Sequence, residues 1–324
     1  SAVDMVYISN TAGVVKALDI SNGSLRWSFA TGGKIFSSPD ICESSGTLVV
    51  GSSDNFIYGL DARSGALRWR VEAAKSVLGS PAIYNGIAYI GASDGVFRAI
   101  DVRSGRVVWS YGGIRGFVEA RPWVDSEGVY IGDWANYVYA FDPVDGGLQW
   151  EWTNRKGRGL SPAAVWPVKA GGKVFVVTPE RRSHAIDAVT GRELWSARGG
   201  RESLGLSEDG SLLYVKTMFD SLFAFSTGSY GLPAAGAVGV ATPVWTTAVG
   251  YDYEISPSPV TAAYGLIFVP TDKGNVFALN AADGSVAWRY RFSIALINYV
   301  RPIGDRKILV TSMDGKVILA RVRE

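Results

Sequence analysis

Hydrophobic residues along this chain fall in short runs that are rich in β-branched and aromatic side chains, as in Phe56-Ile57-Tyr58. Clusters of Gly, Asp, Asn and Ser separate these runs. Short alternating runs between such clusters are typical of β-strands joined by tight turns. Helix signals are almost absent. The pattern therefore predicts an all-β protein.

One module recurs along the chain. In six copies an Asp or Asn stands four residues before a glycine, which stands four residues before a tryptophan. An Asx side chain accepts hydrogen bonds from nearby backbone amides and starts a turn, and glycine supplies the positive φ that a tight turn needs. We interpret these positions as structural. The copies are Asp19, Gly23 and Trp27; Asp61, Gly65 and Trp69; Asp101, Gly105 and Trp109; Asp142, Gly146 and Trp150; Asp187, Gly191 and Trp195; and Asn280, Gly284 and Trp288.

The period of the module predicts propeller blades. Trp245 joins the six tryptophans, and the seven are separated by 42, 40, 41, 45, 50 and 43 residues. Most intervals also contain a proline-bearing run and a second apolar run, so that a repeat holds four short strands, as in a propeller blade. We predict a single β-propeller over residues 1–324 with eight blades, the first and last incomplete. Seven blades with a hybrid closing blade is the alternative.

Composition narrows the class of protein. Apolar residues make up 47% of the chain, and the net charge of +2 does not indicate nucleic-acid binding. The lone Cys42 excludes an internal disulfide, and the lone His184 excludes a histidine-rich metal site. Residues 221–251 carry no charge, but their Gly, Pro and Thr content predicts a loop and no membrane span. Because the chain opens in mid-repeat, we expect a mature form or an excised domain.

The repeat resembles a known family. A Ser-Pro run, an apolar strand, Gly-x-x-Asp-Gly, Ala-hydrophobic-Asp and x-x-x-Gly-x-x-x-Trp together are similar to the quinoprotein-type (PQQ-like) β-propeller repeat. Relatives include quinone-dependent dehydrogenases and BamB-like propellers. The stretches 201–210, 215–218 and 253–259 look more like stand-alone or phosphoesterase-linked bacterial propellers. The resemblance implies an exported bacterial protein, periplasmic or extracellular.

Quinone chemistry is not expected from this resemblance. The family's dehydrogenases resemble one another in a Ca²⁺ ion held by Glu and Asn, an Asp base and a disulfide of adjacent cysteines. Cys42 cannot form that disulfide, and no matching set of Glu, Asn and Asp is evident. We therefore expect no cofactor, no metal and no catalytic residue.

Charged residues near the starts of the proline-bearing strands form a candidate ligand site. Strand order places these residues at the mouth of a central channel, where buried charges should be paired. One interpretation is a ring of salt bridges that closes the channel, and the other is a pocket for an anionic or sugar-like ligand. The candidate residues are Glu119, Arg121, Arg201, Glu202, Tyr253, Glu254 and Arg301.

Basic and aromatic residues in the loops between blades and in the hairpins predict a second, partner-binding surface, and ordinary loop packing is the alternative for the aromatic residues. Tyr251 and Tyr253 look exposed there, and aromatic plates beside charged groups suit sugars or peptides. The predicted partner-binding residues are Trp134, Arg155, Lys156, Arg158, Arg181 and Arg182.

These observations favour a non-enzymatic binding or scaffold module that recognises a protein partner or a small anionic or sugar-like ligand. We expect a monomer or a domain of a larger chain, without nucleic acid as a partner. The alternative is an enzyme, either a PQQ-dependent oxidoreductase or a hydrolase or lyase with its site at the channel mouth.

Overall fold

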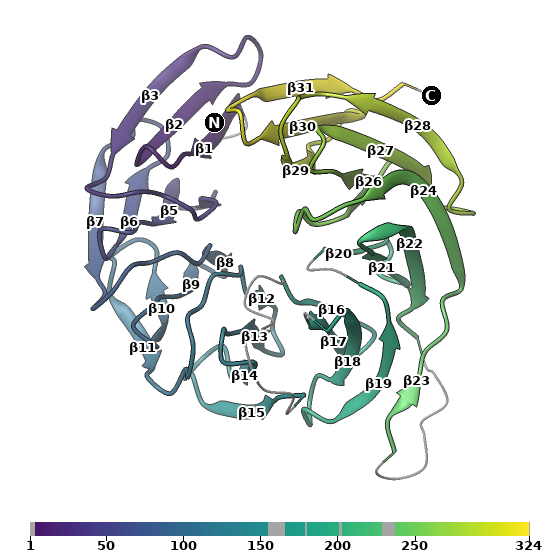
Figure 1. Ribbon diagram of the computed structural model, residues 1–324. Coiled ribbons are helices and arrows are strands. Elements are labelled where there is room, and N and C mark those ends of the chain that lie inside the picture. Colours follow the sequence, from purple (N-terminus) through teal and green to yellow (C-terminus); the bar gives the residue numbers. More distant parts are fainter. Residues whose placement is uncertain (1–3, 155–165, 179, 201–202, 229–236, 324) are drawn as a thin grey trace. The chain divides into compact units, whose positions relative to one another are not determined.

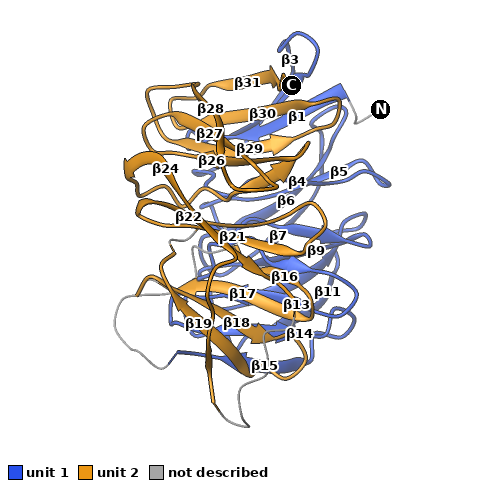
Figure 2. Ribbon diagram, turned by 90° about the vertical axis from the view of Figure 1, so that its right-hand side faces the viewer, with its two compact units in different colours: residues 1–164 blue, residues 165–324 orange. Residues whose placement is uncertain are grey.

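The computed structural model describes residues 4–154, 166–178, 180–200, 203–228 and 237–323. The chain divides into two compact units, residues 1–164 and residues 165–324, which are described separately below (Figure 2). The described residues contain no α-helix, and hence no helix that could cross a membrane.

Unit 1 contains four antiparallel sheets, in each of which consecutive strands are neighbours (Figure 1). The first sheet has three strands and the other three sheets have four. The sheets are β1 (Met5–Ser9), β2 (Val14–Asp19) and β3 (Leu25–Ala30); β4 (Asp40–Cys42), β5 (Thr47–Gly51), β6 (Phe56–Asp61) and β7 (Leu67–Glu72); β8 (Ala82–Tyr84), β9 (Ile87–Gly91), β10 (Phe97–Asp101) and β11 (Val107–Tyr111); and β12 (Trp123–Val124), β13 (Val129–Gly132), β14 (Val138–Phe141) and β15 (Leu148–Trp152).

Unit 2 also contains four sheets, the last of which has three strands. They are β16 (Val168–Ala170), β17 (Lys173–Thr178), β18 (Arg182–Asp187) and β19 (Glu193–Arg198); β20 (Leu204–Leu206), β21 (Leu212–Lys216), β22 (Phe219–Ser226) and β24 (Trp245–Tyr253); β25 (Thr261–Ala263), β26 (Leu266–Pro270), β27 (Asn275–Asn280) and β28 (Val286–Arg291); and β29 (Ile297–Pro302), β30 (Lys307–Ser312) and β31 (Val317–Arg321). Strand β23 (Gly239–Val240) joins the first of these sheets.

The chain is thus an all-β, eight-bladed β-propeller, and the eight sheets are numbered below as blades 1 to 8 in chain order. The predicted eight blades are confirmed, and the seven-bladed alternative is wrong. That the blades form one domain stays a prediction. The strands that follow Pro39, Pro81 and Pro122 lie at the edges of their sheets, where a proline can be accommodated although it lacks a backbone N–H.

The turn between the third and fourth strands is built as the sequence predicts. In blade 3 the Asp101 carboxylate accepts hydrogen bonds from the Ser104 N–H at 2.8 Å and from the Ser104 hydroxyl at 2.7 Å. Gly105 closes the turn with φ of 72° and donates its N–H to the Asp101 carbonyl at 2.9 Å. The polar groups of the turn are thus hydrogen-bonded within the turn itself.

In blades 2, 3, 4 and 7 this turn also receives the tryptophan of the preceding blade. The Trp69 indole N–H donates to the Val102 carbonyl of blade 3 at 2.8 Å, and the Trp27 indole N–H donates to the Ala62 carbonyl of blade 2 at 2.9 Å. A Cβ atom placed on Gly105 would lie only 2.6 Å from Trp69 Cγ. The glycine is therefore needed both for its positive φ and for its lack of a side chain. We call this packing of an indole ring on the turn glycine of the next blade the tryptophan seat.

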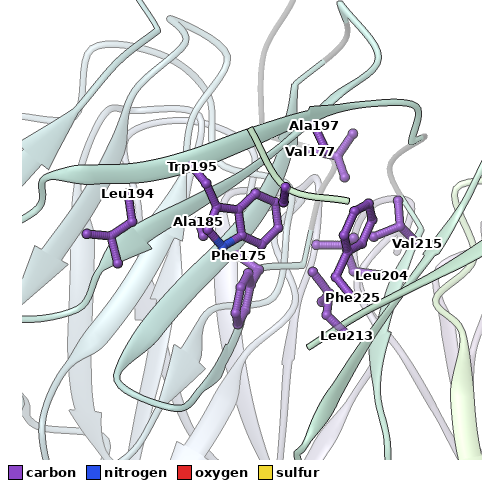
Figure 3. Packing of buried hydrophobic residues seen from close by; sticks show 11 residues of the cluster. Phe175, Val177, Ala185, Leu194, Trp195, Ala197, Leu204, Leu213, Val215 and Phe225 are labelled. Carbon is purple, nitrogen blue, oxygen red and sulfur yellow. The ribbon is translucent and has the colours of Figure 1, made fainter. Parts of the chain in front are cut away.

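Buried side chains of neighbouring blades share one core. Between blades 5 and 6, Trp195 packs against Phe175 and Phe225 at ring-centroid distances of 5.8 and 5.5 Å (Figure 3). Leu204 and Val215 of blade 6 belong to the same cluster. Burial of such side chains stabilises the fold by about 1.5–3 kcal/mol each.

Strand β23 is a feature that the sequence did not predict. It lies in the connection between β22 and β24 of blade 6, within the uncharged stretch 221–251, but it pairs in parallel with β19 of blade 5. Trp195 faces Gly239 and Ser196 faces Val240 in this register. The connection thus gives blade 5 a fifth strand and covers its outer edge, where an unpaired strand would be open to other chains.

The tryptophan seat predicts a difference between two glycines of blade 3. Gly86 has φ of 78° but nothing within 4 Å of the place that a Cβ atom would take, whereas Gly105 has φ of 72° and the Trp69 ring above it. Gly86→Ala should cost about 1–2 kcal/mol for the left-handed backbone alone. Gly105→Ala should cost about 1–3 kcal/mol more, since the indole must shift. Urea unfolding of both variants measures the difference, and equal losses would contradict the role of the seat.

The turn aspartates predict acid sensitivity. The Asp61 pKa falls from 3.8 to about 2, because hydrogen bonds from Arg68 and Ser64 outweigh the desolvation by burial that would raise it. A lowered pKa in the folded state gives stability that is present above the unfolded value and is lost as the pH falls toward about 2. Urea unfolding from pH 6 to pH 2 should show this loss, and Asp61→Asn should reduce its slope. An unchanged slope in this variant would contradict the assignment.

Candidate functional site

The candidate site lies on what we call the loop face of each unit, formed by the loops that enter the blades and by the hairpins between second and third strands. A hairpin aspartate fixes this face. In blade 4 the Asp133 carboxylate accepts the Gly116 N–H of the entering loop and the Tyr139 hydroxyl, both at 2.9 Å. Asp54 accepts the Gly32 N–H at 2.6 Å in blade 2. These aspartates hold loop backbone and are structural.

The channel-mouth residues of unit 1 are partly paired. Arg121 donates to the Asp40 carboxylate at 2.8 Å and to the Pro81 carbonyl at 3.1 Å. The same Asp40 oxygen accepts the Ile83 N–H at 2.9 Å. Arg121 therefore ties together the innermost strands of neighbouring blades, as in the salt-bridge interpretation. Glu119 is half-buried in the loop that enters blade 4.

Large apolar side chains project from the loop face of unit 1. Trp134 is 45% exposed on the hairpin of blade 4, and its backbone N–H donates to the carbonyl of Phe117, which is also exposed. A depression of about 460 Å³ in the same blade is lined by Tyr137, Glu151, Trp152 and Thr153. Trp134 is therefore accessible to a partner, although its predicted role in partner binding stays a prediction.

Glu254, predicted at the channel mouth, is fully buried in unit 2. Its carboxylate lies 3.3 Å from Lys216 Nζ, and neither side chain is exposed to solvent. It also accepts the Ser256 N–H at 2.8 Å and the Asp272 N–H at 2.9 Å. Burial raises the Glu254 pKa, although the nearby Lys216 ammonium opposes the shift. Because neither side chain is accessible to solvent, we interpret this ion pair as structural.

This ion pair replaces an apolar contact of other blades. Lys216 stands at the end of the second strand of blade 6, where blades 2 and 3 end in Gly51 and Gly91. A Cβ atom on Gly51 would lie 2.5 Å from Val77, the buried residue of the next loop. Val77 donates its N–H to the hairpin of the preceding blade, and Glu254 does the same at 3.1 Å. The repeat therefore exchanges a Gly–Val contact for a buried Lys–Glu pair at one junction.

The remaining predicted residues have separate environments. The expectation that Tyr251 is exposed is wrong: it is buried, and its hydroxyl donates to the Ser221 carbonyl at 2.7 Å. Its neighbour Tyr253 is exposed, as is Arg181, whereas Arg182 donates to the Ser196 hydroxyl. Arg301 is exposed on β29. The predicted Arg155, Lys156, Arg158, Arg201 and Glu202 lie outside the described residues.

His184 has the orienting carboxylate that the sequence could not place. Its Nδ1 lies 2.7 Å from Glu193 Oε1, and its Nε2 lies 3.0 Å from the Thr178 hydroxyl. A carboxylate, an imidazole and a hydroxyl in this order could activate a nucleophile. Thr178 is however fully buried, so we interpret the chain of bonds as structural.

The sheets, their tryptophan seats and the fixed loop faces define a PQQ-like repeat β-propeller. A family model described as "Outer membrane protein assembly factor BamB" matches residues 11–164, 118–242 and 233–321. The chain therefore belongs to this family.

Individual relatives agree with this assignment. Outer membrane protein assembly factor BamB of Burkholderia pseudomallei is 30% identical over 145 residues, which are 44% of this chain and 34% of that protein. The matched stretch thus spans about a third of the relative. The BamB structure from Moraxella catarrhalis has a TM-score of 0.79 at 20% identity, over 98% of this chain and 93% of that one.

A dehydrogenase shares the fold. Quinohemoprotein alcohol dehydrogenase from Comamonas testosteroni has a TM-score of 0.73 at 14% identity, over 95% of this chain and 69% of that one. A likeness at this level of identity concerns architecture, because one fold hosts many activities.

The buried pair predicts a result for two variants. Glu254→Val leaves the Lys216 ammonium buried without its carboxylate and should cost about 3–5 kcal/mol. The double variant Lys216→Gly and Glu254→Val restores the pair that blades 2 and 3 use, and it should recover most of this loss. Urea unfolding measures both free energies. If the double variant is no more stable than Glu254→Val, the ion pair does not take the place of the Gly–Val contact of blades 2 and 3.

Proposed function

We propose that this chain is a non-enzymatic scaffold that binds a protein partner through its loop faces, outside the cytoplasm, in the assembly of outer-membrane proteins. The observation that carries the proposal is a set of large apolar side chains exposed on the loops and strand ends of the loop faces, whose backbone is held by internal hydrogen bonds. They are Phe36, Phe117 and Trp134 in unit 1 and Phe219, Tyr253, Ile255, Ile294 and Met313 in unit 2.

Physical reasoning supports a partner at such a surface. Exposed aromatic side chains serve as anchors of protein interfaces, since they bury much area and lose little conformational entropy. A backbone that is already fixed lowers the entropy cost of binding further. The family name supports outer-membrane assembly as the setting and an extracytoplasmic location, because the matched relatives are named as assembly factors for that membrane.

The proposal predicts that the double variant Phe117→Ser and Trp134→Ser binds purified outer-membrane assembly proteins of the source organism at least about tenfold more weakly, as expected for two anchor residues. The matched control is Val144→Ser, because Val144 is 79% exposed in the same blade but lies in the turn after β14. Biolayer interferometry measures the affinities. Binding that is absent from the unsubstituted protein, or lost equally in the control, would contradict the proposal.

A further inference from the structure

Three exposed side chains from different segments meet on the loop face of unit 2. The Arg181 guanidinium carbon lies 5.4 Å from the centroid of the Phe219 ring, and the Phe219 and Tyr253 rings are 5.7 Å apart. Phe219 and Tyr253 face each other across β22 and β24. Their exposed fractions of 62% and 52% leave much of both rings accessible. We call these three residues the Arg181 cluster.

The residue type at position 181 departs from the repeat, although its backbone conformation does not. Its φ is 59°, in the left-handed region that costs an L-residue about 1–2 kcal/mol. The hairpins of blades 2, 3, 4 and 7 have Asn55, Gly95, Asn136 and Gly274 with φ between 71° and 80°, residue types that adopt this conformation readily. An unfavourable residue at a position where the repeat offers favourable ones indicates a role outside folding.

The aromatic pair is held by internal bonds. The Asp220 carboxylate accepts the Tyr251 N–H at 2.6 Å, and the Tyr251 hydroxyl is bonded to the Thr217 and Ser221 carbonyls. On the other side of Tyr253, Glu254 is fixed by the buried ion pair with Lys216. Tyr253 is thus an exposed residue between the buried Tyr251 and Glu254, and these two residues fix its backbone position in the absence of a partner.

The charges around the cluster indicate the chemistry of the partner. Within the part of the chain that the structure describes, no carboxylate pairs with Arg181, whose guanidinium therefore keeps its donors for a ligand. Arg182 and Arg198 lie opposite each other in the register of β18 and β19. The acidic residues beside the two rings have other partners: Asp220 accepts backbone N–H groups, and Asp252 lies 3.8 Å from Lys273. A guanidinium beside two open rings suits a carboxylate next to an aromatic group.

Building on the proposed scaffold function, we propose that the Arg181 cluster binds a peptide segment of the partner in which Asp or Glu stands next to an aromatic residue. The carboxylate pairs with Arg181, while the aromatic side chain packs on Phe219 and Tyr253. Ile255, which is exposed beside Tyr253, extends the apolar surface.

The test uses the full chain and a labelled peptide, Gly-Asp-Phe-Asp-Phe-Asp-Gly, in fluorescence anisotropy. Control peptides carry Lys in place of Asp, or Ala in place of Phe. We expect the acidic aromatic peptide to bind best. Arg181→Asn should weaken its binding about tenfold, which corresponds to about 1.4 kcal/mol. Phe219→Ala should weaken binding as well.

Two controls separate binding from folding. Asn occupies the same hairpin position in blades 2 and 4, so Arg181→Asn should unfold at the same urea concentration as the unsubstituted chain or at a higher one. Arg192→Asn removes an exposed arginine of the same blade, in the turn before β19, and should leave peptide affinity unchanged.

Several results would overturn the inference: equal affinity in Arg181→Asn, equal binding of the Lys peptide, or a preference for anionic phosphatidylglycerol vesicles or single-stranded DNA over the peptide. The outcome also separates this inference from the proposed function. If assembly proteins bind Arg181→Asn as tightly as the unsubstituted chain, only the inference fails. If they bind neither protein, the proposed function itself fails.

Discussion

The contact between a tryptophan and the turn of the next blade is the interaction on which the rest of this propeller depends. Within each unit the indole ring covers a turn glycine, as Trp69 covers Gly105 and Trp245 covers Gly284. In unit 1 the indole N–H also bonds a carbonyl of that turn. The contact sets the spacing of neighbouring blades, and this spacing brings the entering loops against the hairpins that form the loop face.

Much of the fold could be predicted from sequence because the same turn and strand residues recur at the same spacing in six copies of the repeat. Asp101, Gly105 and Trp109 each meet a separate demand, for a turn acceptor, a positive φ and an apolar plate, and the demands recur in every regular blade. Counting the repeats favours eight blades, but the seven tryptophan-bearing repeats left a seven-bladed ring open, and the structure decides for eight. Strand β23 could not be predicted, since its two residues have no strand pattern of their own and gain their partners only from the edge of β19.

The candidate site was predicted less well, because exposure depends on side-chain direction and not on residue type. Tyr251 and Tyr253 are two residues apart and look alike in sequence, yet one is buried and the other is exposed. The positive φ of Asp252 turns the backbone between them. Glu254 looked like a ligand residue, but its buried partner Lys216 is far away in sequence. Phe219 was missed, although a large apolar residue beside the irregular hairpin of blade 6 was a usable signal.

The tryptophan seat has a consequence for how such chains lengthen over evolution. Each regular module contains both parts of the contact: the tryptophan that packs on the next blade, and the glycine turn that receives the tryptophan of the module before it. A tandem duplication therefore supplies a new ring together with a new seat, and the copy is compatible with its neighbours from the start. The hairpin of the copy can then change in sequence, because the tryptophan and the turn glycine, and not the hairpin residues, hold neighbouring blades together. Positions such as 181 and 216 show where divergence has replaced a repeated residue with an individual one.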